Sequence, residues 1–160
     1  MLEKEFEKLY KILGESVSEC TAEYIALSGG LDSSIISFFL QPRKINAISI
    51  IADGFIGTDL MYCQTAAKKF GFPLTLKMVS IEDIITGINE TIKILQVFNN
   101  IEIRNSVVMY LALKAIKEKG YTKIITGDGA DELFAGYNFF LRMNETELKE
   151  NLKRLWETMH

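Results

Sequence analysis

The sequence contains one histidine, two cysteines and two prolines in 160 residues. The histidine is His160, the last residue, where chains are usually mobile, so histidine acid–base and Ser-His-Asp chemistry are not expected. Cys20 and Cys63 form no CxxC pair, which argues against zinc and redox motifs and predicts two buried thiols. No apolar run approaches the roughly 18 residues of a spanning helix, and residues 1–11 are too charged for a signal peptide. We therefore expect a cytoplasmic protein with no membrane segment.

An excess of positive charge is also absent. The formal net charge is −3 and the isoelectric point is about 5.3, so no basic surface for nucleic acid or anionic membrane is expected. The length fits a single domain covering residues 1–160, and 48% hydrophobic content is ordinary for a globular protein. An acidic protein can still bind a polyanion through backbone N–H groups, a few cations and a metal ion.

Apolar periodicity predicts an alternation of helices and strands. Short apolar runs predict strands at residues 23–27, 45–51, 73–79 and 122–126. Helical spacing and capping residues predict helices at residues 2–17, 33–40, 58–70 (capped by Thr58), 81–95 (capped by Ser80), 102–119 and from a capping box at 144–147 onward. This order predicts an α/β fold of three layers, α/β/α, with a parallel sheet of about four to five strands. Ligands of such sheets bind beyond the carboxyl ends of the strands, where the strand order reverses.

The first motif, Ser28-Gly29-Gly30-Leu31-Asp32-Ser33-Ser34, joins a predicted strand to a predicted helix. Two glycines allow positive φ and close approach of the backbone to a ligand. The following helix directs its free N–H groups and the positive end of its dipole toward that ligand. The loop therefore predicts a phosphate pocket with hydroxyl donors at Ser28, Ser33 and Ser34. It is neither a Walker A loop nor a GxGxxG fingerprint, because both of those patterns are missing.

Asp32 is unusual in a phosphate pocket, because a carboxylate repels phosphate. Its presence is explained if it holds Mg²⁺ that bridges it to the phosphates. The alternative is a plain Gly-Gly turn in which Asp32 only caps the helix.

The second motif, residues 126–132, follows the fourth predicted strand and reads Thr-Gly-Asp-Gly-Ala-Asp-Glu. Three carboxylates within five residues repel each other unless a cation or hydrogen bonds compensate, and hard cations bind such oxygen ligands. The alternative is a solvated acidic turn. A phosphate loop and a carboxylate cluster at the same end of one sheet together favour a magnesium–nucleotide site.

These residues carry a family resemblance. Residues 28–33 resemble the pyrophosphate-binding loop of ATP pyrophosphatases, and residues 127–137, Gly-Asp-Gly-Ala-Asp-Glu-Leu-Phe-Ala-Gly-Tyr, are similar to the asparagine synthetase and β-lactam synthetase branch. Residues 57–60 and 103–111 resemble two further segments of that family. The resemblance covers nearly the whole chain and implies the adenine nucleotide alpha hydrolase-like, Rossmann-like fold.

The resemblance also implies a reaction. The family activates a carboxylate, aspartate-like here, with ATP and Mg²⁺, and releases pyrophosphate to form an acyl-adenylate that ammonia attacks. The positions it implies for the nucleotide are Ala26, Leu27, Ser28, Gly29, Gly30, Asp32, Ser33, Ser34, Ile51, Ala52, Thr126, Gly127 and Tyr137. It implies Asp32 and Asp131 as magnesium ligands.

Three positions match the catalytic set of the family, namely Asp128, Glu132 and Arg104. Asp128 is one methylene shorter than the Glu that is common at this position, which shortens its reach. Arg104 matches the arginine of the family's Ile-Arg helix, and a surface ion pair is the alternative role.

The resemblance has consequences for partners. Full-length members begin with a cysteine nucleophile that Met1-Leu2 cannot replace, so ammonia is expected from solution or from a separate glutaminase or completing subunit. The family's downstream lysines lie beyond residue 160, and Lys153 and Arg154 are the last cations. The amphipathic first and last helices can form a homodimer face. Two alternatives stay open, a non-catalytic ATP- or AMP-binding module and an ATP pyrophosphatase acting on tRNA, which the acidic composition disfavours.

Overall fold

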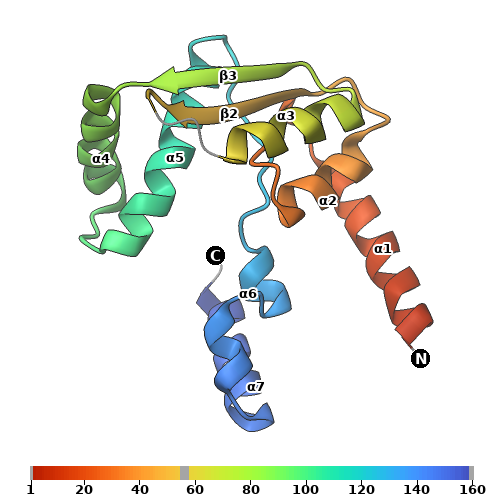
Figure 1. Ribbon diagram of the computed structural model, residues 1–160. Coiled ribbons are helices and arrows are strands. Elements are labelled where there is room, and N and C mark those ends of the chain that lie inside the picture. The colour runs from red at the N-terminus through yellow and green to blue at the C-terminus, as the bar shows by residue number, and fades with distance from the viewer. Residues whose placement is uncertain (1, 55–57, 159–160) are drawn as a thin grey trace. The chain divides into compact units, whose positions relative to one another are not determined.

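The computed structural model describes residues 2–54 and 58–158, in two compact units, Met1–Thr126 and Gly127–His160 (Figure 1). The two units are described separately, and the single domain expected from the sequence stays a prediction. His160 and Gly57 lie outside the described residues, as does the side chain of Thr58.

The first unit contains three parallel strands and five helices among its described residues. The strands are β1 (Tyr24–Ala26), β2 (Asn46–Ala52) and β3 (Leu74–Val79). The helices are α1 (Leu2–Glu19), α2 (Leu31–Leu40), α3 (Thr58–Phe70), α4 (Ile81–Leu95) and α5 (Asn100–Lys117). Each of these elements was predicted from the sequence within a few residues of its bounds.

The sheet has the order β1-β2-β3, and the predicted fourth strand is reduced to one bridge on the other side of β1. Ile125 accepts a hydrogen bond from Ala26 N at 2.9 Å and donates one to Tyr24 O at 2.8 Å. The prediction of four to five strands is therefore wrong for the described residues. β1 has only three residues, so it offers a fourth strand little length to pair with.

The two faces of the sheet are covered by different helices, because side chains alternate along each strand. Ile25 and Ala47 share one hydrophobic cluster with α2 and α3. Ile48 and Ile50, on the opposite face, pack with α5 and α4. These contacts confirm the three-layer α/β/α arrangement. Figure 1 shows α4 and α5 side by side, close to the arrowhead of β3.

Capping residues fix the start of α4, as the sequence predicted. Ser80 Oγ accepts from Asp83 N at 3.1 Å, and Asp83 Oδ2 accepts from Ser80 N at 3.0 Å. This reciprocal capping box satisfies two backbone donors that the first turn of a helix leaves without partners.

The second unit contains α6 (Ala130–Phe134), a 3₁₀ helix η1 (Asn138–Arg142) and α7 (Glu145–Thr158). The capping box predicted for α7 is present, with Asn144 Oδ1 accepting from Glu147 N and Glu147 Oε2 accepting from Asn144 N, both at 3.0 Å. Neither α6 nor η1 was predicted, because five-residue helices are too short to show an apolar period. Within the described ranges, no helix has the length and apolar character needed to cross a membrane.

Candidate nucleotide site

Serine hydroxyls close the loop between β1 and α2 on itself. Ser28 Oγ lies 3.1 Å from Ser33 Oγ and accepts from Gly30 N at 3.2 Å. Ser33 is buried, and its hydroxyl also lies 3.3 Å from the carbonyl oxygen of Gly30. The structure thus brings Ser28, Gly30 and Ser33 together as expected. Ser28 and Ser33, two of the three expected hydroxyl donors, therefore also form hydrogen bonds within the loop.

Gly29 is the residue on which the shape of this loop depends. Its φ is +79°, and a Cβ added there would lie 2.5 Å from Cys63 N in the backbone of α3. A side chain is therefore excluded both by conformation and by the close passage of another backbone segment. The sequence predicted the positive φ, but the approach of α3 is visible only in the fold.

The loop leads directly into the amino terminus of α2, whose N-cap residue is Gly30. Asp32 stands in the first turn of that helix and is not its N-cap residue. The alternative reading of Asp32 as the residue that caps the helix is therefore wrong. The free N–H groups at the start of a ten-residue helix and its positive dipole end suit an anion such as phosphate.

The ends of the first two strands carry the positions expected to hold adenine. Leu27 is buried, and its carbonyl accepts a hydrogen bond from the hydroxyl of Ser49, a buried residue of β2. Ser49 was not singled out from the sequence. Its signal was a serine between the isoleucines Ile48 and Ile50 of β2.

Ile51 and Ala52, the other two positions expected to hold adenine, follow each other in β2 and so face opposite sides of the sheet. Ala52 lines a cavity between α4 and α5, whereas Ile51 shares the face that Ala47 presents to α2 and α3. One ligand can contact both Ile51 and Ala52 only if it lies across the carboxyl end of β2.

The strand order reverses beside β1. β2 pairs on one side of β1 and Ile125 on the other, so the chain leaves β1 in one direction and later returns to its opposite side. Ligands of open α/β sheets bind at this crevice. The Ser28–Ser34 loop follows β1, and Thr126 follows the bridge, so both lie where the topology places a ligand.

In the second unit, the acidic segment 128–132 is built into a folded element. Gly129, with φ of +90°, is the N-cap residue of α6. The hydroxyl of Tyr137 donates to Glu132 Oε1, and the indole Nε1 of Trp156 in α7 donates to Glu132 O at 2.9 Å. The alternative of a merely solvated acidic turn is thus wrong for Glu132. Trp156 was not predicted to have this role.

Gly136 packs directly against Asp131. A Cβ at Gly136 would lie 3.0 Å from Asp131 Cγ and 3.2 Å from its Cα, and would overlap a carboxylate oxygen. The absence of a side chain at residue 136 therefore sets the position of this carboxylate.

The carboxylates of this segment change the acidity of Tyr137. Its hydrogen bond to Glu132, together with partial burial and the negative charges of Glu132, Asp131 and Asp128, raises the pKa of Tyr137 to about 12. Each of these effects disfavours the phenolate. Tyr137 is therefore a neutral hydrogen-bond donor throughout the physiological range.

The two expected magnesium ligands belong to different units, Asp32 to the first and Asp131 to the second. Over residues 2–54 and 58–158, no three His, Cys, Asp or Glu side chains form a group that could hold a metal ion. The carboxylate oxygens of Asp32 and Asp131 are of the kind that a hard cation such as Mg²⁺ prefers as ligands. The pairing of these two residues stays a prediction.

Arg104 lies on α5 and lines the same cavity as Ala52. Its side chain is exposed. In the described part of the chain it takes part in no ion pair, so the alternative of a surface ion pair is not observed.

The sequence profile of the asparagine synthase family matches residues 10–158. The chain belongs to this family. Asparagine synthetase B [glutamine-hydrolyzing] of Escherichia coli is 30% identical over 151 residues, which cover 85% of this chain and 27% of the relative. A putative asparagine synthetase [glutamine-hydrolyzing] of Methanocaldococcus jannaschii is 30% identical over 132 residues, covering 80% of this chain and 24% of the relative. The chain thus spans about a quarter of the length of these asparagine synthase relatives.

Two solved structures are also similar. The NH3-dependent NAD synthetase of Campylobacter jejuni has a TM-score of 0.48 and 19% identity, covering 85% of this chain and 60% of its own. The NMN synthetase of Francisella tularensis has a TM-score of 0.49 and 20% identity, covering 82% and 56%. The adenine nucleotide alpha hydrolase-like fold expected from the sequence agrees with membership of the asparagine synthase family. It also agrees with a parallel sheet that carries helices on both faces.

Proposed function

We propose that this chain binds ATP with Mg²⁺ and activates a carboxylate by adenylation, releasing pyrophosphate, so that ammonia can form an amide. The observation that carries this proposal is the Ser28–Ser34 loop at the reversal of strand order, with Gly29 against the backbone of α3. A loop with no room for a side chain and a helix amino terminus behind it suits close binding of a polyphosphate.

Each group of residues has a role in this proposal. The backbone of Gly29 and Gly30 and the amino terminus of α2 hold the phosphates, and the ends of β1 and β2 contact the base. The carboxylates of Asp32 and Asp131 are the oxygen ligands for Mg²⁺, as the family resemblance implies. Bound Mg²⁺ neutralises phosphate charge that these carboxylates would otherwise repel.

The acidic segment serves the acyl half of the reaction. Glu132 is held on its side chain by Tyr137 and on its backbone by Trp156, so it keeps one orientation through the reaction. Asp128 and Arg104 complete the proposed catalytic set. Aspartate is the first carboxylate to test, because the relatives are named asparagine synthetases.

The nitrogen source and assembly are part of the same proposal. The relatives are named glutamine-hydrolyzing, so a glutaminase on a separate chain is the proposed source of ammonia, with free ammonium as its substitute in vitro. The homodimer and the cytoplasmic location stay predictions from the sequence.

The test is pyrophosphate release from ATP in the presence of Mg²⁺, ammonium and aspartate. We expect pyrophosphate release in the unaltered protein. Asp32→Asn and Asp131→Asn should each reduce this release at least tenfold, whereas the control Glu118→Gln should leave it unchanged. Calorimetry of ATP binding separates the remaining possibilities. Binding without release identifies a nucleotide-binding module or one half of a two-chain synthetase, and absence of binding refutes the proposal.

A further inference from the structure

A second site lies between α4 and α5, in the first unit. It is a cavity of about 960 Å³ with walls made mostly of isoleucine, valine and leucine. Ile84, Ile88 and Ile92 line it from α4, and Ile103, Val107 and Leu111 from α5. Its size and apolar character match those of small-molecule pockets, which usually measure about 300–1,000 Å³ and carry few polar groups.

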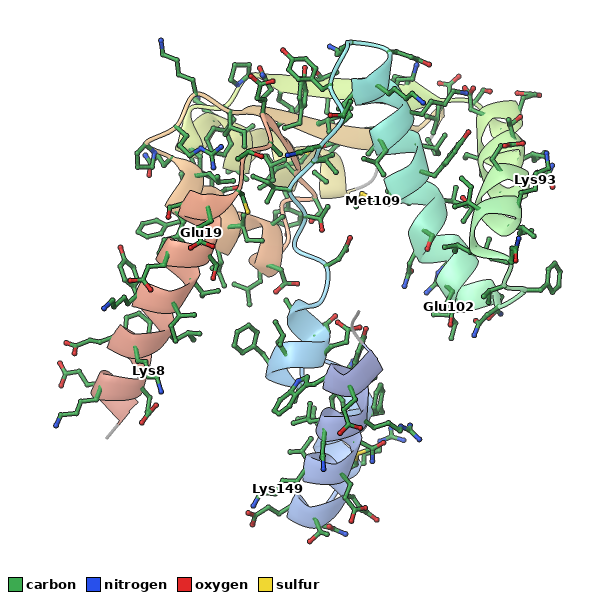
Figure 2. All side chains as sticks on the ribbon, turned by 180° about the vertical axis from the view of Figure 1, so that it is seen from behind. Lys8, Glu19, Lys93, Glu102, Met109 and Lys149 are labelled. Atoms are coloured by element: carbon green, nitrogen blue, oxygen red, sulfur yellow. The ribbon has the colours of Figure 1, made fainter. Side chains whose placement is uncertain are left out.

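The polar groups of this pocket gather at one end. Asn99, Asn100 and Arg104 line it near the start of α5. Asn99 is already engaged, because its Oδ1 accepts from Ile101 N at 3.0 Å as the cap of α5. Arg104 is the one charged residue among those that line the cavity. Within the described residues, no carboxylate forms an ion pair with it. Figure 2 shows α5 rising from Glu102 past Met109 toward the sheet. Arg104 is the fifth residue of α5, which begins at Asn100, so it belongs to the outer end of the helix.

The inner end of the pocket meets the sheet at its ligand-binding edge. Ala52 and Val79, the last residues of β2 and β3, both line the cavity. The carboxyl ends of parallel strands lie at one edge, so this pocket and the loop after β1 share that edge of the sheet.

We propose that the α4–α5 pocket binds a monocarboxylic acid with an apolar body, whose carboxylate pairs with Arg104 and whose hydrocarbon lies against the isoleucines. One unpaired guanidinium beside an apolar cavity complements one anionic group on an apolar ligand. Aspartate fits it poorly, because its ammonium and second carboxylate would be buried without partners. The binding of this acid does not rest on the proposed function, in which aspartate is the first carboxylate to test.

The binding test uses the full chain without ATP, so that it is independent of the reaction. Butyrate, hexanoate and octanoate are titrated by calorimetry, with octanol and aspartate as comparison ligands. We expect affinity to rise up to about fourfold for each added methylene, from the usual value for burying that group. We expect octanoate to bind at least tenfold more tightly than octanol, and aspartate to show no binding.

Two matched pairs of variants locate the site. Arg104→Ala should lower octanoate affinity at least tenfold, to that of octanol, whereas Arg142→Ala, an arginine of the second unit, should have no effect. Ile88→Glu should abolish binding, whereas Ile94→Glu should not, because Ile94 is on the same helix but is 66% exposed and does not line the cavity. Circular dichroism checks that each variant is folded, and Arg104→Ala, at an exposed position, serves if Ile88→Glu does not fold.

Several outcomes overturn the proposal. Equal affinity for octanoate and octanol would show that the carboxylate of the ligand contributes nothing to binding. Unchanged octanoate binding in Arg104→Ala would show that Arg104 is not the partner of that carboxylate. A dimer that Ile88→Glu converts to a monomer, without acid binding by either form, shows that a second copy covers the groove instead. Pyrophosphate release with aspartate but no octanoate binding refutes only this pocket, and octanoate binding without pyrophosphate release refutes only the proposed reaction.

Discussion

Two glycines of the motifs face different neighbours, and the nature of the neighbour decides the effect of a substitution. Gly29 faces the backbone of α3, whereas Gly136 faces the carboxylate of Asp131. Backbone inside a helix cannot give way without distorting that helix, but a carboxylate can rotate.

Gly29→Ala should destabilise the first unit by about 3 kcal/mol, because the strain of positive φ adds to overlap with Tyr62 and Cys63. Gly120→Ala is the control, since Gly120 has φ of +88° but open space around it. Gly120→Ala should lower the free energy of unfolding by only about 1–2 kcal/mol, from the strain of positive φ alone. Urea denaturation measures both values, and equal losses would show that contact with α3 is unimportant.

Gly136→Ala should leave stability within about 1 kcal/mol of the original, because the overlapping group is a side chain that can turn away. It should nevertheless displace Asp131 and reduce Mg²⁺-dependent pyrophosphate release as strongly as Asp131→Asn does. Release that is unchanged in Gly136→Ala but lost in Asp131→Asn would contradict the link between these two positions.

The pKa of Tyr137, raised to about 12, predicts a titration separate from that of ordinary tyrosines. The folded value lies above the unfolded value of about 10, so its contribution to stability is complete below pH 10 and is lost as the pH rises through 12. The difference in absorbance at 295 nm between the protein and Tyr137→Phe should show this midpoint. Glu132→Gln should move it toward 10, and a midpoint near 10 in the unaltered protein would contradict the hydrogen bond.

At the scale of elements, capping residues placed the helix starts well. Ser80 was recognised from the sequence as a cap and Asn144 with Glu147 as a capping box, because both patterns depend only on residues within three positions of each other. The reciprocal bond of Asp83 to Ser80 was not predicted. The fourth strand was misjudged, because pairing depends on the length of the neighbouring strand, and β1 is short. α6 was missed because a five-residue helix is too short to show an apolar period.

The cap of α4 provides an element-scale prediction. Ser80→Ala should destabilise the first unit by about 1 kcal/mol. Ser18→Ala should be near neutral, because the Ser18 hydroxyl only bonds the Glu15 carbonyl in an exposed part of α1. Thermal unfolding of both variants measures the difference, and equal midpoints would contradict the role of Ser80.

The same cap has a pH dependence of known sign. Hydrogen bonds from the backbone and hydroxyl of Ser80 lower the pKa of Asp83 below the ordinary value of an aspartate side chain. The stabilisation is therefore present above pH 4 and is lost as the pH falls through the folded pKa. The difference in stability between the protein and Asp83→Asn should shrink in that acidic range.

At the scale of the whole molecule, nucleotide binding should appear as added stability. ATP with Mg²⁺ at 100 times its dissociation constant adds about 2.7 kcal/mol to the free energy of unfolding. For a chain of this size that is a rise of roughly 5–10 °C in the unfolding midpoint. Asp32→Asn should remove most of this rise, measured against the midpoint of that variant without ligand, and a full rise in that variant would rule out Asp32 as a metal ligand.

The sequence by itself determined the local features of this protein. The helix caps, the Ser28–Ser34 loop, its positive φ and the acidic segment all depend on residues within a few positions of each other, and such patterns are visible along the chain. The family resemblance rested on the same short segments and was confirmed by the match to residues 10–158.

Only the tertiary structure decided which distant residues meet. The approach of α3 to Gly29, the hydroxyl of Ser49 on the Leu27 carbonyl and the indole of Trp156 on Glu132 join residues 22 to 34 positions apart. The cavity shared by Ala52 and Arg104 is of the same kind. Contacts at such separations follow from how helices pack on the sheet, and the spacing of residues along the chain carries no record of that packing.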